Sequence, residues 1–100
     1  MVVIGKEAIA KFTRRYSDCR NELQAWVRIC EDAQWRNFLE VQSVFSDADQ
    51  VGDCAVFNIR RNKYRLVAKI NFRGHIIVVR GVMTHAEYDR GGWKNGCNCK

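Results

Sequence analysis

The sequence predicts an α+β protein in which two to three N-terminal helices pack on a small antiparallel sheet and a short helix follows the last strand. Apolar residues recur every three or four positions up to about residue 45, as in helices that face a core. From residue 54 they alternate with polar residues, as in strands with one buried face. The 100 residues include no proline and no repeat, so residues 1–100 are expected to form one domain.

The first half of the chain is expected to hold one short strand and the helices. The strand is expected at 2–4 and the helices at 6–16, 17–30 and 35–45. In the second helix, Leu23 and Trp26 share one face, and Ser17 or Asp18 is a suitable N-cap for the first turn. Tryptophan and phenylalanine at such spacing are interpreted as core residues.

The second half is expected to form three antiparallel strands after a turn-rich loop. The loop covers 46–53 and the strands cover 54–59, 63–72 and 75–83. In the middle strand, aromatic and aliphatic residues face one way, while Lys63, Arg65 and Lys69 face the other. The dipeptide at 73–74 suits a hairpin turn.

A two-residue turn also fixes the expected register of the hairpin. It places Arg80 opposite Val67, on the face that carries Arg65 and Lys69, and it places Met83 on the apolar face. One face of the sheet is therefore expected to be basic and partly open.

The positive charge lies in the second half of the chain. Residues 1–50 carry seven Lys/Arg and eight Asp/Glu, whereas residues 51–100 carry ten and three. This asymmetry favours an anionic partner, nucleic acid first, over a surface that is basic only for solubility. The sequence has no signal peptide and no apolar run of about 18 residues, so a soluble, cytoplasmic protein is expected.

Five cysteines are scattered along the chain. An odd, dispersed set favours reduced thiols over a disulfide framework. Cys97 and Cys99 could begin a zinc site, but such a site needs four ligands and the chain has only two histidines. No metal site is therefore predicted, and the role of these two cysteines stays open.

The segment MTHAEYD after the last strand has the pattern of a helix start. Thr84 and Glu87 can form a capping box, and Met83 and Tyr88 can form a hydrophobic staple. This pattern does not require His85, which is either an ordinary surface histidine or a functional one. Because the helix dipole favours a neutral imidazole at this end, His85 could act as a base, and Tyr88 lies on the same helical face.

These residues beside a basic sheet face could cleave RNA without a metal, because the 2′-hydroxyl of RNA supplies the nucleophile. Arg65 and Arg80 can stabilise the charge of the transition state, and His85 can transfer a proton. Cationic neighbours are expected to lower the pKa values of Tyr88 and Lys63, so that both could share the proton transfers.

Several roles remain open on the residues alone. Arg65 and Arg80 could equally belong to a solvated basic face. Asp89 either orients a basic side chain or is a plain surface carboxylate, and Arg90 is either a phosphate contact or a surface arginine. No Ser-His-Asp or P-loop pattern occurs, which argues against other hydrolases and NTPases.

The segments VFNIRRNKYRLVAKINF and VMTHAEYD, together with FLEVQSVFSDADQVGD upstream, resemble the HigB toxin family of the RelE superfamily. The resemblance covers most of the chain. It implies a toxin of a bacterial type II toxin–antitoxin system, an endoribonuclease (mRNA interferase) that cuts mRNA on the ribosome without a metal or cofactor and inhibits translation. The implied partners are a HigA-like helix-turn-helix antitoxin and the operator DNA that their complex binds.

The resemblance also implies roles for single residues. The arginine that lies near the scissile phosphate in RelE-like strands matches Arg65, and the C-terminal tyrosine matches Tyr88. His85 stands near the position of an arginine in RelE, and TH is normal for HigB. The expected catalytic residues are His85, Tyr88, Arg65 and Lys63. The expected RNA-binding residues are Arg60, Arg61, Lys69, Arg80 and Arg90. The departure GGW at 91–93 is expected to shorten the last helix.

Two other functions remain as alternatives. A ParE-like gyrase inhibitor has a similar fold and no catalysis, although it would not need His85 beside Arg65 and Tyr88. A passive basic RNA-binding protein would bind RNA with a strong salt dependence and cleave nothing.

Overall fold

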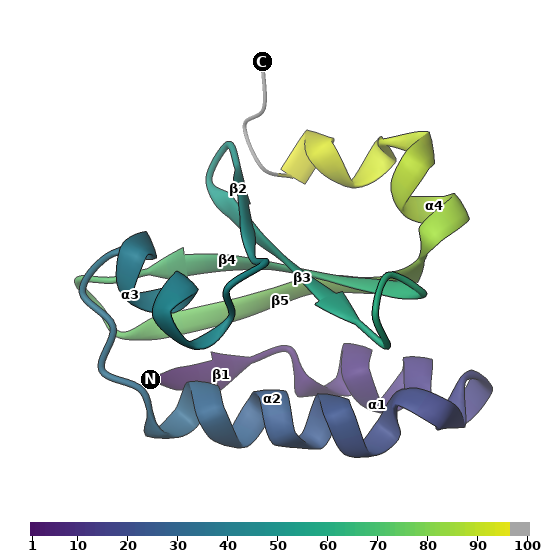
Figure 1. The fold of residues 1–100 in the computed structure, drawn as a ribbon, viewed down its shortest axis with the longest axis horizontal. Coiled ribbons are helices and arrows are strands. Elements are labelled where there is room, and N and C mark those ends of the chain that lie inside the picture. The colour runs from purple at the N-terminus through teal and green to yellow at the C-terminus, as the bar shows by residue number, and fades with distance from the viewer. Residues whose placement is uncertain (97–100) are drawn as a thin grey trace.

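Two long helices lie on one side of a five-stranded sheet, and a short helix near the C-terminus lies beyond the other side (Figure 1). This computed structural model describes residues 1–96. The strands are β1 (Val2–Ile4), β2 (Asp49–Val51), β3 (Cys54–Ile59), β4 (Tyr64–Asn71) and β5 (Ile76–Thr84). The α-helices are α1 (Lys6–Arg15), α2 (Arg20–Asp32), α3 (Phe38–Val44) and α4 (His85–Arg90), with 3-10 helices at Ser17–Cys19 and Gly92–Gly96. The predicted α+β class is confirmed.

The helix starts differ from the prediction at two places. α3 begins at Phe38 because the side chain of Asn37 accepts a hydrogen bond from the first turn at 3.0 Å and caps the helix. Neither Ser17 nor Asp18 caps α2, so that prediction is wrong: Cys19 is the N-cap and has no side-chain cap bond. The carboxylate of Asp18 is bound elsewhere.

The strands follow the order β1-β5-β4-β3-β2. The four strands β2 to β5 pair antiparallel as consecutive neighbours, whereas β1 runs parallel to β5, so the sheet is mixed. β2 lies inside the segment 46–53 that was predicted to be a loop. Three residues are too few to show the alternation of a strand, so local pattern does not reveal β2.

The main core lies between the sheet and the helices α1 and α2. Leu23 and Trp26 of α2 are 0% and 2% exposed, and the Trp26 ring meets the edge of Phe57 on β3 at a centroid distance of 5.3 Å. A smaller apolar cluster lies on the opposite face of the sheet. Its members are Cys54, Val56 and Val67, with Val51, Met83, Tyr88 and Trp93 packed against them. Both faces of the sheet therefore carry apolar side chains.

A β-bulge interrupts the pairing of β4 with β5. The predicted register holds from the turn to the middle of the strands and then shifts by one residue, so that Val67 lies opposite Gly81. Arg80 is the extra residue, and the predicted pair of Arg80 with Val67 is wrong. Beyond the bulge, Met83 lies opposite Arg65 and packs in the smaller cluster rather than in the main core. The bulge therefore decides which face the end of β5 presents.

Gly5 joins β1 to α1 in a conformation that favours glycine. Its φ is +92°, and a Cβ atom there would lie 2.9 Å from the carbonyl oxygen of Val79. We expect Gly5→Ala to lower the free energy of unfolding by about 1–3 kcal/mol, because both the backbone angle and the contact oppose the methyl group. Urea denaturation measures this loss. Gly92→Ala is the control, since no atom of the described residues lies within 4 Å of its added Cβ and little change is expected; an equal loss in both would contradict the argument.

The described cysteines have two different environments. Cys19 and Cys30 are buried free thiols, and burial raises the pKa of Cys30 to about 12. Cys54 is disulfide-bonded, so the expectation of reduced thiols is wrong for this residue. Cys97 and Cys99 lie outside the described residues.

No helix within residues 1–96 has the length and apolar character that a bilayer span requires.

Candidate functional site

Arg65 projects from β4 into the smaller cluster and is only 9% exposed. Its Nη1 atom donates to the carbonyl oxygens of Asn62 at 3.0 Å and Tyr64 at 3.3 Å. Its Cζ atom lies 5.2 Å from the centroid of the Tyr88 ring. Within residues 1–96, Nε and Nη2 donate to no protein atom, so part of the planar fork is left unbonded. A charged guanidinium held in this way can bind an anion strongly.

Tyr88 is held between neighbours of two kinds. Its ring contacts the Arg65 guanidinium and stacks on the indole of Trp93, with centroids 4.8 Å apart. The indole Nε1 atom of Trp93 donates to the Tyr88 carbonyl oxygen at 2.8 Å. Burial raises the pKa of Tyr88 by more than the charge of Arg65 lowers it, so the expectation of a lowered pKa is wrong. Tyr88 therefore stays protonated at neutral pH and can donate a proton.

His85 is the first residue of α4, and the predicted capping box fixes its position. Thr84 accepts from the Glu87 amide at 3.2 Å, and Glu87 accepts from the Thr84 amide at 3.1 Å. The His85 amide donates to the Lys63 carbonyl oxygen at 3.2 Å, which ties α4 to the start of β4. Its Nδ1 atom lies 2.9 Å from an Asp89 carboxylate oxygen, and the imidazole is about half exposed. Asp89 thus orients the ring and leaves Nε2 for a proton transfer.

Lys63 is paired with a carboxylate from the other half of the chain. Its Nζ atom lies 2.8 Å from Asp18, which also accepts from the Tyr64 hydroxyl at 2.9 Å. The hydrogen bond to Asp18 raises the pKa of Lys63, so the expectation of a depressed lysine is wrong. Lys63 remains a cation at neutral pH, and its amine is not a base there.

The pairing of Asp18 predicts a pH dependence of stability. Hydrogen bonds from Lys63 and Tyr64 hold the pKa of Asp18 below its usual 3.8, so ionised Asp18 stabilises the fold above that pH and the contribution is lost as the pH falls below it. We expect Asp18→Asn to be less stable than wild type at pH 7, with a difference that shrinks below about pH 4. Urea denaturation across this range measures it. Asp32→Asn, at the end of α2 and without an ion pair among residues 1–96, is the control; a difference independent of pH would contradict the assignment.

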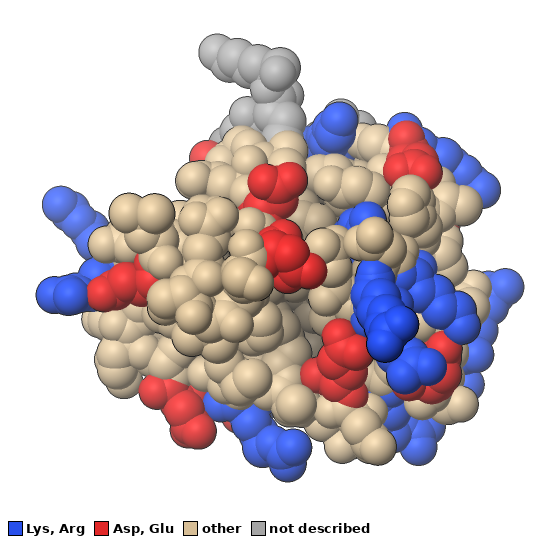
Figure 2. Space-filling view, viewed as in Figure 1, with Lys and Arg blue, Asp and Glu red and all other residues tan. Residues whose placement is uncertain are grey.

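The turn between β3 and β4 displays further cations. Arg60, Arg61 and Asn62 all have positive φ, which is unusual outside glycine. The Glu22 carboxylate accepts from the Arg60 amide at 3.1 Å, and the Arg60 side chain approaches Asp18 at 4.0 Å. Figure 2 shows Lys and Arg side chains gathered on the side of the molecule that carries this turn and α4, with carboxylates next to them. The carboxylates of Asp18 and of Glu22 in α2 thus partly neutralise the positive charge of this surface.

The other three predicted RNA-binding residues lie apart from this turn. Lys69 is two residues along β4 from Val67 and pairs with Asp53 at 3.7 Å. Arg80 is exposed at the bulge, and Arg90 is exposed in the last turn of α4. Hydrogen bonds from Thr84 lower the pKa of Glu87, and the charge of Arg90 adds to this effect. The structure therefore brings Arg65 and Tyr88 into contact and bonds the backbone of His85 to that of Lys63, whereas the Lys63 ammonium lies at Asp18 and not beside Arg65. The predicted RNA-binding residues are spread over the β3–β4 turn, β4, the bulge and α4.

Sequence reasoning missed two residues that build this site. Asp18 was interpreted as a helix cap, and nothing in the sequence links it to Lys63, 45 residues away. The sequence indicates Trp93 only as part of the segment GGW, which is expected to shorten α4. The helix does end at Arg90, with Gly91 as its C-cap. A tryptophan five residues after a tyrosine could have indicated the stacked pair that supports Tyr88.

Taken together, the site offers a buried cationic fork, a protonated phenol and a histidine oriented by a carboxylate. This combination suits proton transfer on a bound anion such as a phosphate diester. Among residues 1–96, no group of three or more His, Cys, Asp or Glu side chains is placed to hold a metal ion.

A helical layer on a small sheet, with such a site beside the last helix, defines a protein of the RelE-like toxin class. The HigB toxin family, described as the RelE-like toxic component of a toxin-antitoxin system, matches residues 19–91. The chain belongs to this family, and the resemblance inferred from the sequence is confirmed. A toxin of such a system has an antitoxin as its partner.

Relatives in enterobacteria carry functional names. The chain is 28% identical over 92 residues to the mRNA interferase toxin HigB of Escherichia coli (strain K12), covering 89% of this chain and 88% of the relative. The mRNA interferase HigB proteins of Escherichia coli O157:H7 and Shigella flexneri match with the same identity and coverage.

Proposed function

We propose that this protein is an mRNA interferase, a metal-independent endoribonuclease that cuts mRNA on the ribosome and inhibits translation. The observation that carries the proposal is Arg65, a nearly buried guanidinium under Tyr88 whose Nε and Nη2 atoms donate to no atom of residues 1–96. The names of the enterobacterial relatives support the same reaction. The protein acts in the cytoplasm, where its substrate is.

The site residues divide the work of RNA cleavage. The 2′-oxygen attacks the adjacent phosphorus, the bond to the 5′-oxygen breaks, and the products are a 2′,3′-cyclic phosphate and a free 5′-hydroxyl. One proton leaves the 2′-hydroxyl and one reaches the 5′-oxygen, and His85 and Tyr88 are the two proton carriers. Arg65 stabilises the extra negative charge on the phosphate oxygens, and the cation of Lys63 adds to this field.

The basic surroundings hold the RNA and the ribosome. Arg60, Arg61, Arg80 and Arg90 are exposed and contact phosphates, while Lys69 lies farther along the sheet. A HigA-like antitoxin with a helix-turn-helix domain neutralises the toxin, and their complex binds its own operator DNA.

Induced expression without antitoxin tests the proposal. We expect growth arrest, mRNA fragments with 5′-hydroxyl ends and intact DNA. Intact mRNA beside DNA damage would instead identify a ParE-like gyrase inhibitor. Intact mRNA with harmless, salt-sensitive RNA binding would identify a passive RNA-binding protein.

We expect His85→Ala to lower the cleavage rate by about 100-fold, because a general acid–base residue is lost while Tyr88 remains. The assay is single-turnover cleavage of mRNA on purified ribosomes. The imidazole is about half exposed, so the fold should be kept. His75→Asn is the matched control, since the other histidine is exposed at the β4–β5 turn with a φ that asparagine accepts. Equal rates in the two variants would remove His85 from the site.

A further inference from the structure

Within residues 1–96, the face of the sheet that carries Arg65 is covered at only one end. Near α4, Val67 and Met83 are packed beneath Tyr88 and Trp93. Toward the β4–β5 turn, the same face carries Ile4 of β1 and Val78 of β5, which lie opposite each other in the register. Ile4 is 48% exposed and Val2 of the same strand is 60% exposed, so two aliphatic side chains of β1 lie open on this face. An apolar part of this face is therefore open.

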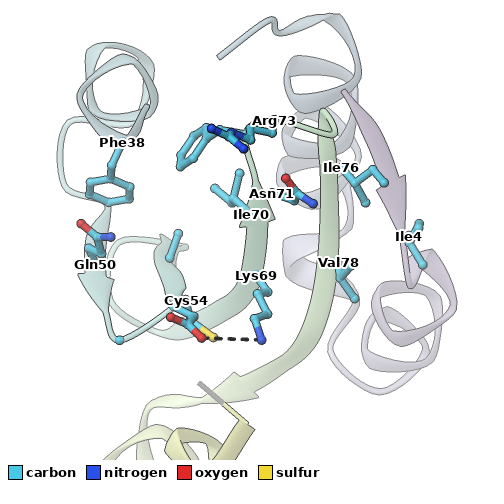
Figure 3. Close-up of a pocket in the computed structure, with 14 residues that line it drawn as sticks. Ile4, Phe38, Gln50, Cys54, Lys69, Ile70, Asn71, Arg73, Ile76 and Val78 are labelled. Carbon is cyan, nitrogen blue, oxygen red and sulfur yellow. Dashed lines mark ion pairs between the residues drawn. The ribbon is translucent and has the colours of Figure 1, made fainter. Parts of the chain in front are cut away.

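This open part forms a groove of about 820 Å³ (Figure 3). Ile4, Ile76 and Val78 line one side, and Phe38 and Gln50 line the other. The groove is large enough for several side chains of a bound segment.

Both ends of the groove carry a cation. Arg73 lies at the end near the β4–β5 turn and forms no ion pair within residues 1–96. Lys69 lies toward the other end and pairs with Asp53 across 3.7 Å, with both side chains nearly half exposed. Such an exposed pair is weak and can exchange for another carboxylate. The charges therefore fit an occupant that is acidic at its ends.

The lining decides between a nucleic acid and a protein. Single-stranded nucleic acid is held by aromatic stacking along a basic path. The two aromatic side chains of this groove, Phe38 and Phe72, are partly buried against the main core, whereas the aliphatic Ile4 is 48% exposed. Aliphatic walls flanked by cations fit a protein segment with apolar side chains and carboxylates. A toxin of this family has an antitoxin as its protein partner.

We propose that this groove is a docking site for a segment of the antitoxin, with its aliphatic side chains against Ile4 and Val78 and its carboxylates at Arg73 and Lys69. The proposal rests on the proposed function in one respect, because neutralisation of toxicity is one of its readouts. None of the four proposed catalytic residues lines the groove. Antitoxin binding and RNA cleavage can thus be separated by substitution.

The first test measures affinity directly. Purified toxin variants are titrated with the full-length cognate antitoxin, and their fold is checked by circular dichroism. We expect Ile4→Asp and Arg73→Glu each to weaken binding at least about tenfold, because they place a negative charge where the antitoxin presents apolar or acidic groups. Val44→Asp is the matched control, since Val44 is 51% exposed on α3 and lies outside the groove; its affinity should equal that of wild type. Unchanged affinity in both folded groove variants overturns the proposal. The same holds if Ile4→Asp only dissociates a dimer of the free toxin, because a second copy then fills the groove.

The second test uses growth. Each groove variant alone should still arrest growth, and co-expressed antitoxin should no longer rescue it. Full rescue of both groove variants overturns the docking site. If wild-type toxin alone does not cleave mRNA, the proposed function fails, while the affinity measurement still decides the docking site.

Discussion

Replacing Arg65 with alanine is expected to lower the rate of mRNA cleavage by about 1,000-fold. The guanidinium is 9% exposed, and its unbonded Nε and Nη2 donors can meet the phosphate where charge develops. A preorganised donor in a water-poor site contributes about 100- to 1,000-fold, and a bidentate cationic donor lies at the upper end of this range. Single-turnover cleavage on purified ribosomes measures the change.

Two further variants separate charge from geometry. Arg65→Lys keeps the positive charge but loses the planar fork, so its rate should fall between those of wild type and Arg65→Ala. Arg90→Ala removes an exposed arginine from the neighbouring helix and should change the rate by less than about tenfold. A rate for Arg65→Ala close to that of Arg90→Ala would show that Arg65 does not contact the reacting phosphate.

Replacing Trp26 with alanine is expected to lower the free energy of unfolding by about 3–5 kcal/mol, which is the usual cost of removing a large buried aromatic ring. Trp26 is 2% exposed and meets Phe57 edge-on, so the cavity would open between α2 and the sheet. A domain of this size is stable by only about 5–15 kcal/mol, so the variant should be close to unfolding. Urea denaturation at 25 °C measures the loss.

Trp26→Phe provides the comparison within the same site. The indole Nε1 atom of Trp26 is buried and has no hydrogen-bond partner among residues 1–96. Phenylalanine removes this unsatisfied donor and leaves a smaller cavity, so its loss should be much smaller than that of alanine. Equal losses for the two variants would mean that ring volume does not set the stability here.

The sequence predicted those parts of the fold that local patterns specify. The helices, the strands β3 to β5 and the capping box at Thr84 follow from periodicity and from short-range hydrogen bonding. β2 could not be predicted because three residues are too few to show alternation, and the parallel pairing of β1 could not be predicted because its partner β5 lies far along the chain. The bulge at Arg80 is invisible to alternation, since one extra residue changes the facing of β5 without changing its composition.

The sequence indicated candidate residues for the site, but it did not indicate the burial and the charged neighbours of each side chain. Of the four residues proposed from motif and face, Arg65 and Tyr88 are in contact and the His85 amide bonds to the Lys63 carbonyl, while the Lys63 side chain turns to Asp18. Their electrostatics were misjudged for Tyr88 and Lys63, because burial and a distant carboxylate decide their pKa values. Asp18 is placed beside Lys63 only by the packing of α2 against the sheet, which no local pattern encodes.

The bulge in β5 decides on which face of the sheet the residues beyond it lie, and therefore on which side the candidate site is built. Val78 before the bulge and Met83 after it are an odd number of positions apart, so regular alternation would place them on opposite faces. Because Arg80 is an extra residue between them, both lie on the Arg65 side. In the register that the turn sets, a regular ladder would place Met83 opposite Tyr64, on the main-core face, and α4 would then begin on the wrong side of the sheet. Deleting Arg80 would instead leave Val67 opposite Gly81 and Arg65 opposite Met83, because the unpaired residue is the one removed. The position of α4 therefore depends on which residues of β4 pair with the end of β5, and not on the side chain at position 80.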